Sequence, residues 1–229
     1  MILSRNQLPW IVSFPRSGSH WVNCALELYS GRRRCFQIGF PMNTISLLSR
    51  EVPREHFWIH THQAAGIKKP KKVAFLTRDI VDVIYSYSWA QKRHTDDLIE
   101  HFIDQTVPKY FETYKKWLID TPADIGVTYA NIMTKPKIEF RKLVEFLEFD
   151  WDEVKALQCL GEVTKSKLAE NGKLGNAFFG PQLMTEEYKI KRGLFRSRYG
   201  HKIHEIYHEL ATKSHCELLL EYQQNNFGS

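Results

Sequence analysis

The alternation of short apolar runs with helical patterns is the feature that most constrains how this chain folds. Apolar runs typical of buried strands occupy residues 10–14, 57–59, 73–77 and 125–129. Apolar residues at helical spacing lie between and after them, in stripes such as Phe140, Leu143, Val144 and Leu147. This alternation predicts an α/β fold with a parallel sheet covered by helices. The sequence shows no internal repeat or dividing linker, so we expect a single domain over residues 1–229.

Composition and charge narrow the class of protein and of partner. Of the 229 residues 43% are hydrophobic, enough for a core, which excludes disordered, collagen and coiled-coil chains. There is no secretory signal at the start and no apolar run long enough to span a membrane. We therefore expect a cytoplasmic protein without an integral membrane segment. The net charge of +6 favours an anionic partner such as a nucleic acid, a membrane surface or a polyphosphorylated small molecule.

The segment of residues 13–21 has the character of an anion-binding turn. It lies between a predicted strand and a predicted helix, so consecutive backbone N–H groups and the helix N-terminus can face one anion. Gly18 lets the backbone approach closely, and Ser17 and Ser19 add hydroxyl donors. The Arg16 guanidinium can bind two oxyanion oxygens at once. The plainer alternative is a Pro-Gly turn capped by serine. The Gly-Lys-Ser or Gly-Lys-Thr of nucleoside-triphosphate loops is missing, which disfavours metal-assisted hydrolysis of such nucleotides.

A second strand-to-helix junction, at residues 76–88, offers another cation. Arg78 ends the predicted strand and Ser86 follows two helical turns later, so both side chains could converge on one phosphate. An equally good interpretation pairs Arg78 with Asp79 or Asp82.

Two histidines, His60 and His62, lie between these junctions in the sequence. Histidine suits a general base, because a base whose pKa is near the working pH removes a proton efficiently. For an isolated histidine, an imidazole satisfied in the core is the simpler interpretation. The order of the surrounding motifs favours His62 as a base.

Together these motifs resemble those of the sulfotransferases that use 3′-phosphoadenosine 5′-phosphosulfate (PAPS). Phe14-Pro-Arg-Ser-Gly-Ser-His-Trp21 is similar to their 5′-phosphosulfate loop, with Arg16 in place of the lysine of cytosolic members, as in carbohydrate sulfotransferases. Arg78 and Ser86 match the 3′-phosphate motif, and His62 matches the catalytic base. The resemblance implies a P-loop-like, three-layer α/β domain with a central parallel sheet flanked by helices. It also implies in-line transfer of a sulfuryl group from PAPS to a hydroxyl acceptor such as an alcohol, carbohydrate or glycolipid.

The resemblance implies a role for each matching residue. His62 would deprotonate the acceptor, and Arg16 would neutralise charge on the transferring group, with no metal ion. His20 and His60 stand where the family has threonine and lysine, and Thr164 would correspond to a threonine near the adenine. The residues implied to bind PAPS are Arg16, Ser17, Gly18, Ser19, His20, Trp21, Arg78, Ser86, Tyr129, Lys191, Arg192 and Gly193.

The stretch of residues 164–193 is rich in Gly, Lys and Asn and has weak periodicity, so we expect a loop or lid there. Acceptor contacts would lie in loops such as residues 31–48, 94–104 and 169–185, and the implied partner is a small-molecule or carbohydrate acceptor. The basic group Arg32–Arg34 could meet an acidic acceptor, although a solvated turn is the simpler interpretation. The sequence leaves the acceptor and the oligomeric state open.

A different class of enzyme competes with this interpretation. His204-Glu205-x-x-His208 matches the pattern of zinc hydrolases, in which two imidazoles share a helix face and the glutamate activates water. Ala211 and Ser214 stand where the longer form of this motif has glycine and histidine. The zinc hydrolase is therefore the alternative rather than the first choice.

A third candidate is a basic nucleic-acid-binding protein that stacks bases on aromatic side chains. The candidate platforms lie in apolar runs typical of a core, and no known nucleic-acid motif accompanies them. We expect no nucleic-acid partner. The platforms would be Trp21, Trp58 and Trp89.

Overall fold

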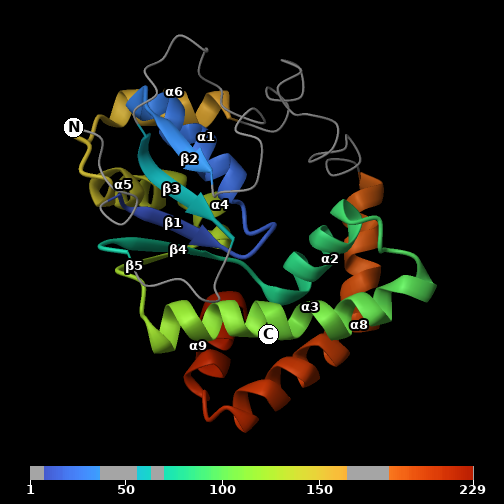
Figure 1. The fold of residues 1–229 in the computed structure, drawn as a ribbon. Helices are drawn as coiled ribbons and strands as arrows, with labels where there is room; N and C mark the ends of the chain where they lie inside the picture. The colour runs from blue at the N-terminus through green and yellow to red at the C-terminus, as the bar shows by residue number, and fades with distance from the viewer. Residues whose placement is uncertain (1–7, 37–55, 63–69, 164–185, 229) are drawn as a thin grey trace.

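The computed structural model describes residues 8–36, 56–62, 70–163 and 186–228, and Figure 1 shows its ribbon. Within these residues a sheet of five parallel strands has the order β2-β3-β1-β4-β5. The predicted parallel sheet is confirmed, although β2 was not among the predicted strands. The strands are β1 (Trp10–Ser13), β2 (Arg33–Phe36), β3 (His56–Thr61), β4 (Val73–Thr77) and β5 (Ile125–Thr128).

Helices cover both faces of the sheet, which confirms the predicted three layers (Figure 1). Successive strand residues point to opposite faces. Ile11 and Ala74 therefore belong to one apolar core, whereas Val12 and Phe75 belong to the other. The first core is covered by α1 (Ser19–Ser30), α4 (Tyr129–Thr134), α5 (Pro136–Phe146) and α6 (Glu153–Glu162). The second is covered by α2 (Ile80–Ala90), α3 (Asp96–Lys115), η2 (Lys116–Asp120), α8 (Glu186–Lys213) and α9 (Leu218–Phe227).

Helix α8 corrects the prediction for the end of the expected lid. Residues 186–193 form the first turns of this 28-residue helix rather than a loop. Residues 164–185, and Thr164 with them, lie outside the described residues. The apolar periodicity is weak because polar contacts hold this end of α8 in place. Arg192 donates to both carboxylate oxygens of Asp82 in α2.

Strand order creates the place where a ligand can bind. Strand β1 lies between β3 and β4. The connection that follows β1 leads to β2 on one side of the sheet, and the connection that follows β4 leads to β5 on the other side, so the two connections diverge. In open parallel sheets a crevice forms outside the carboxyl ends of the strands at such a point. Among the described helices none is long and apolar enough to cross a membrane.

Candidate functional site

Four of the candidate residues lie at or shortly after strand ends at the same edge of the sheet. Arg16 lies three residues after β1, and His62, Arg78 and Tyr129 each follow immediately on β3, β4 and β5. Because the strands are parallel, these segments meet at one edge. The sheet therefore gathers residues that are far apart in the sequence.

The turn after β1 is tight and strained. Gly18 has a φ of 86°, and Arg16 adopts a φ of 74°, which only glycine adopts without cost. A Cβ on Gly18 would lie 2.4 Å from Cδ2 of Tyr129, so no side chain fits there. The first bonded N–H of α1 is that of Val22, which donates to the Gly18 carbonyl at 3.2 Å. The first N–H groups of a helix have no acceptor within the helix, so those of this turn can face an anion.

The two arginine motifs meet in the structure. Arg78 donates through a guanidinium nitrogen to the carbonyl oxygen of Arg16 at 2.8 Å, across 62 residues of sequence. Arg16 Nε in turn donates to Ser86 Oγ at 3.1 Å. Ser86 is buried. The structure thus brings Arg16, Arg78 and Ser86 into one cluster.

Arg78 does not form the ion pairs that the sequence left open for it. Asp79 caps α2 by accepting from the Asp82 N–H, and its carboxylate is bound by Arg196. No ion pair between described residues includes Arg78, and its Nε is buried without a hydrogen-bond partner among them. The guanidinium lies 4.4 Å above the ring of Tyr129. A partly buried cation with these surroundings is suited to an anionic ligand.

Two tyrosines of α3 fix the backbone at Arg78. Tyr110 donates to the Arg78 carbonyl oxygen at 2.6 Å. The Tyr114 hydroxyl accepts from the Arg78 N–H at 2.8 Å and lies 3.0 Å from the same carbonyl oxygen. Sequence analysis missed both, because their spacing in a helical stripe indicates core packing. Both tyrosines are buried, and a buried hydroxyl group needs a hydrogen-bond partner. That need is the only indication of their polar role.

Electrostatics at Arg16 agree with a cluster of positive charge. Burial lowers the pKa of Arg16, the nearby Tyr188 phenol raises it, and the positive charge of Arg78 lowers it further. Arginine remains protonated despite such a shift. Two guanidinium groups are therefore held close together, an arrangement that a phosphate or sulfate would stabilise.

His62 is oriented by the last residue of β1. Its Nδ1 lies 2.9 Å from the Ser13 carbonyl oxygen and 3.1 Å from Ser13 Oγ. Because a carbonyl oxygen only accepts, Nδ1 carries the proton and Nε2 keeps its lone pair. Burial lowers the pKa of His62, the Ser13 hydrogen bond partly opposes this, and Arg16 and Arg34 lower it again. His62 is therefore a neutral imidazole with one basic nitrogen at neutral pH.

The other histidines nearby are also neutral. The ring of His60 lies 4.7 Å from that of His62, and burial holds the pKa of His60 well below its ordinary value. His20, in the first turn of α1, has its Nε2 3.5 Å from Cys24 Sγ. Burial lowers the pKa of His20 to about 3, and the charges of Arg34 and Arg16 act in the same direction. Neither residue supplies a positive charge. Trp21 packs partly buried against the core beneath α1.

Comparison with solved structures identifies the fold. The mouse sulfotransferase SULT7A1 complexed with PAP, the desulfated form of PAPS, matches with a TM-score of 0.64 and 15% identity, over 97% of this chain and 90% of that one. Retinol dehydratase in complex with androsterone and PAP matches with a TM-score of 0.62 and 14% identity, over 93% and 81% of the two chains. The chain has the sulfotransferase fold. No protein-family model matches the sequence, and no curated protein matches it significantly.

On this sulfotransferase fold, the C-terminal candidates lie on α8 rather than in a loop. Lys191 pairs with Glu187 at 2.6 Å, and Arg192 is bound to Asp82. Gly193 faces open space, with nothing near the position of a Cβ. The structure therefore holds Lys191 and Arg192 in ion pairs, and Gly193 has no side chain to contribute.

Tyr188 joins the cluster instead, and sequence analysis missed it. Its phenol is close enough to influence the pKa of Arg16. It precedes Lys191-Arg192-Gly193 in a segment that was expected to be a loop. A single tyrosine beside that motif gave no signal in the sequence.

The zinc motif gains no support from the sulfotransferase fold. His204, Glu205 and His208 line a hollow together with other residues of α8 alone. Within the described parts of the chain, no group of three or more side chains is arranged to hold a metal ion.

Two of the tryptophans considered as stacking platforms for nucleic-acid bases make other contacts instead. Trp58 is fully buried and donates to Asn23 Oδ1 at 2.7 Å, and Trp89 stacks on His94.

Proposed function

We propose that this protein transfers a sulfuryl group from PAPS to a hydroxyl acceptor. The observation that carries the proposal is the meeting of Arg16, Arg78 and Ser86 at the carboxyl edge of the sheet. Three solved structures that share the fold are complexed with PAP, which supports the same nucleotide here.

The residues present fit such a nucleotide. PAPS carries anionic groups at both its 5′ and 3′ positions, and the cluster offers two guanidinium groups. Two buried polar atoms, Ser17 Oγ and Arg78 Nε, have no hydrogen-bond partner among the described residues. Buried donors of this kind are rarely left unsatisfied in a functional protein. We assign the 5′-phosphosulfate to the turn that contains Arg16, Ser17 and Gly18, and the 3′-phosphate to Arg78 and Ser86.

PAPS supplies the sulfuryl group, whose bond to the 5′-phosphate oxygen breaks as the acceptor oxygen bonds to sulfur, with the bonding electrons leaving on the phosphate. The chain's own residues do the rest. His62 Nε2 takes the acceptor's proton, while Ser13 holds the ring in that tautomer. Arg16 and the N–H groups of the turn stabilise negative charge. Removing one such donor costs about 3–4 kcal/mol of transition-state stabilisation in comparable sites.

The acceptor proposed first is a small hydroxyl compound. Retinol dehydratase, one of these neighbours, is complexed with androsterone in one solved structure and with retinol in another. Both compounds carry a hydroxyl group, so they are suitable first members of an acceptor panel. A carbohydrate or glycolipid acceptor belongs in the same panel.

Calorimetry with PAP tests the nucleotide site. We expect the wild type to bind PAP, and Arg78→Gln to weaken binding by about ten- to a hundredfold, as for loss of a hydrogen bond to a charged group. Arg141→Gln is the matched control, because Arg141 is exposed on α5, where it pairs with Glu145 one turn away and lies over the ring of Trp151. Sulfur-35 transfer from labelled PAPS to the panel then tests the reaction. A wild type that ignores PAP, or equal binding by both variants, would contradict the proposal.

A further inference from the structure

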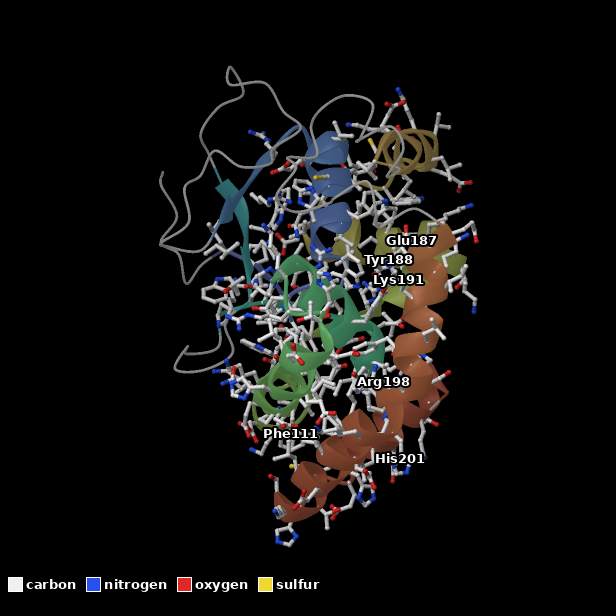
Figure 2. The ribbon with its side chains drawn as sticks, turned by 90° about the vertical axis from the view of Figure 1, so that its right-hand side faces the viewer. Phe111, Glu187, Tyr188, Lys191, Arg198 and His201 are labelled. Carbon is white, nitrogen blue, oxygen red and sulfur yellow. The ribbon has the colours of Figure 1, made fainter. Side chains whose placement is uncertain are left out.

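The first turns of α8 place one aromatic side chain against the Arg16–Arg78 cluster. Figure 2 shows Glu187, Tyr188 and Lys191 together at this end of the helix, away from Arg198 and His201. The ring of Tyr188 lies 5.0 Å from that of Tyr85 in α2, the helix that also carries Ser86. Tyr85 donates its hydroxyl to the Tyr188 carbonyl oxygen at 3.4 Å. Tyr188 is thus seated on α2 close to the proposed phosphate site.

The surroundings of the Tyr188 hydroxyl show where it points. Burial raises the pKa of Tyr188, whereas Arg78, a hydrogen bond with Ser86, and the charges of Arg16 and Arg192 lower it. The same phenol is the largest influence that raises the pKa of Arg16. The hydroxyl therefore faces the three residues assigned to the phosphate groups. The pKa stays above its ordinary value of 10.0, so the group is a protonated donor at neutral pH.

Ion pairs one and two turns further along α8 hold Tyr188 in this position. Arg192 donates from Nε to Asp82 at 2.7 Å. Arg196 binds Asp79 and lies 3.3 Å from Asp82. Because residues four apart share a helix face, these contacts fix the face that carries Tyr188 against α2.

The nearby cations Lys191 and Arg192 are also engaged in ion pairs. Arg192 is bound to Asp82, and Lys191 is paired with Glu187. We propose that Tyr188 donates its hydroxyl to the 3′-phosphate of the bound nucleotide, as a ligand beside Arg78 and Ser86. Helix α8 then completes the phosphate site with a neutral donor rather than with the Lys191-Arg192 cations. This inference rests on the proposed function, because it presumes a 3′-phosphorylated nucleotide.

The test compares two nucleotides and two variants by calorimetry. PAP carries a 3′-phosphate, whereas AMP lacks it and otherwise shares the adenosine and 5′-phosphate. Tyr188→Phe removes one hydroxyl and keeps the ring. Tyr199→Phe is the matched control, since it makes the same change on the same helix where Tyr199 packs beside Phe195. We expect Tyr188→Phe to weaken PAP binding by about tenfold while AMP binding is unchanged, and Tyr199→Phe to alter neither.

Each other outcome overturns the inference. Equal PAP affinity in wild type and Tyr188→Phe would mean that the hydroxyl does not touch the phosphate. Tighter PAP binding by the variant would mean that the hydroxyl occupies the phosphate's place. An equal loss for PAP and AMP, or a large fall in the thermal midpoint, would assign Tyr188 a structural role. Failure of the wild type to bind PAP would instead contradict the proposed function itself.

Discussion

Arg78 has the surroundings of a cation that binds a ligand, in addition to joining the two turns. Its contacts are a backbone carbonyl oxygen and the face of an aromatic ring. A cation–π contact is worth about 0.5–2 kcal/mol, which offsets only part of the cost of partly burying a guanidinium. A bound dianion would supply the remainder. This is why Arg78 is the residue whose exchange should affect nucleotide binding most.

Gly18 offers a sharp test of the turn. In Gly18→Ala the new methyl group would meet Tyr129 at 2.4 Å, and the positive φ of 86° adds strain. We expect a loss of stability of about 1–2 kcal/mol from the backbone strain alone, together with weaker PAP binding as Tyr129 shifts under Arg78. Urea denaturation and calorimetry measure the two effects.

Gly31→Ala separates strain from collision. Gly31 has a φ of 66°, but nothing lies within 4 Å of the position of its Cβ. Gly31→Ala should therefore lose stability through backbone strain alone, while its PAP affinity stays at the wild-type value. Equal PAP affinity in Gly18→Ala and Gly31→Ala would show that the packing of Tyr129 on Gly18 does not matter for the site.

His62 should affect catalysis and not nucleotide binding. We expect His62→Gln to lower kcat by about 10²- to 10⁴-fold, the usual range for a general base, with PAP affinity retained. His101→Gln, an exposed change on α3, is the control. The pKa of His62 lies below its ordinary value of 6.5, so the base stays neutral as the pH falls. The acid limb of kcat should therefore lie below pH 6.5. An unchanged kcat in His62→Gln would remove it as the base.

Among single residues, the sequence predicted those that lie at or after the ends of strands. Arg16, Arg78 and Ser86 were singled out, and the structure brings them together, although their assignment to PAPS stays a prediction. Tyr110 and Tyr188 could not be found in the same way. One lies in an ordinary helical stripe and the other in a segment without periodicity, so only three-dimensional contacts reveal their polar roles.

Among the elements, α2 and α8 depend on each other through two carboxylates. Asp79 caps α2 and binds Arg196, while Asp82 binds Arg192. Burial tends to raise the pKa of Asp82, but the hydrogen bond from Arg192 and the charges of Arg78, Arg192 and Arg196 outweigh it and lower the pKa. Asp82 is thus held ionised and ties α8 to the helix that carries Ser86.

Asp82→Asn tests this connection. The variant keeps the size of the side chain and removes its charge, and Arg192 is itself 43% exposed. We expect a loss of stability of about 1–2 kcal/mol, less than for a fully buried pair. If Tyr188 depends on this anchor, PAP affinity should fall as well. Denaturation and calorimetry measure both.

Asp104→Asn is the control, because Asp104 is exposed and also joins α8, through Lys202, to a neighbouring helix. Exposed pairs of this kind contribute little, so its stability should stay close to the wild type. Equal effects of the two variants would show that α2 and α8 are not held by Asp82 in particular.

Two elements show why the sequence described the fold incompletely. Strand β2 begins at Arg33, and the basic run Arg32–Arg34 was interpreted as a solvated turn. In the structure Arg34 is buried and lies 3.6 Å from the Glu27 carboxylate. A charge neutralised by a distant partner cannot be recognised from local pattern. The start of α8 was missed for the same reason, since its anchors are ion pairs with α2.

For the whole molecule, the parallel sheet and the two layers of helices followed from alternation alone. The strand order β2-β3-β1-β4-β5 did not, because several orders satisfy the same alternation. That order puts β1 between β3 and β4. It therefore decides that the turn with Arg16 lies between His62 on one side and Arg78 on the other.

Buried histidines should make the stability of the whole molecule depend on pH. Burial lowers the pKa of His20 to about 3 and holds those of His60 and His62 below 6.5. As the pH falls below 6.5, the unfolded chain binds protons that the folded chain does not, so stability falls. His20, whose pKa falls to about 3, contributes up to about 1.4 kcal/mol per pH unit between that value and 6.5, and His60 and His62 act in the same direction.

Urea denaturation at pH 7 and pH 5 measures this effect. The window lies above the ordinary pKa of the carboxylates, so histidines dominate it. His20→Gln should reduce the dependence, whereas His101→Gln, at an exposed position, should leave it unchanged. A wild type with the same stability at both values would show that the three imidazoles are not buried in the neutral form.

The bond from Arg78 to the carbonyl oxygen of Arg16 makes the two arginines unequal. That oxygen belongs to the main chain and is present whatever side chain stands at position 16. Replacing Arg16 therefore removes one cation and keeps the hydrogen bond that joins the two turns. Replacing Arg78 removes both a cation and that hydrogen bond. We therefore expect related sequences to vary more at position 16, where lysine can replace arginine, than at position 78, where the side chain both joins the turns and binds the ligand.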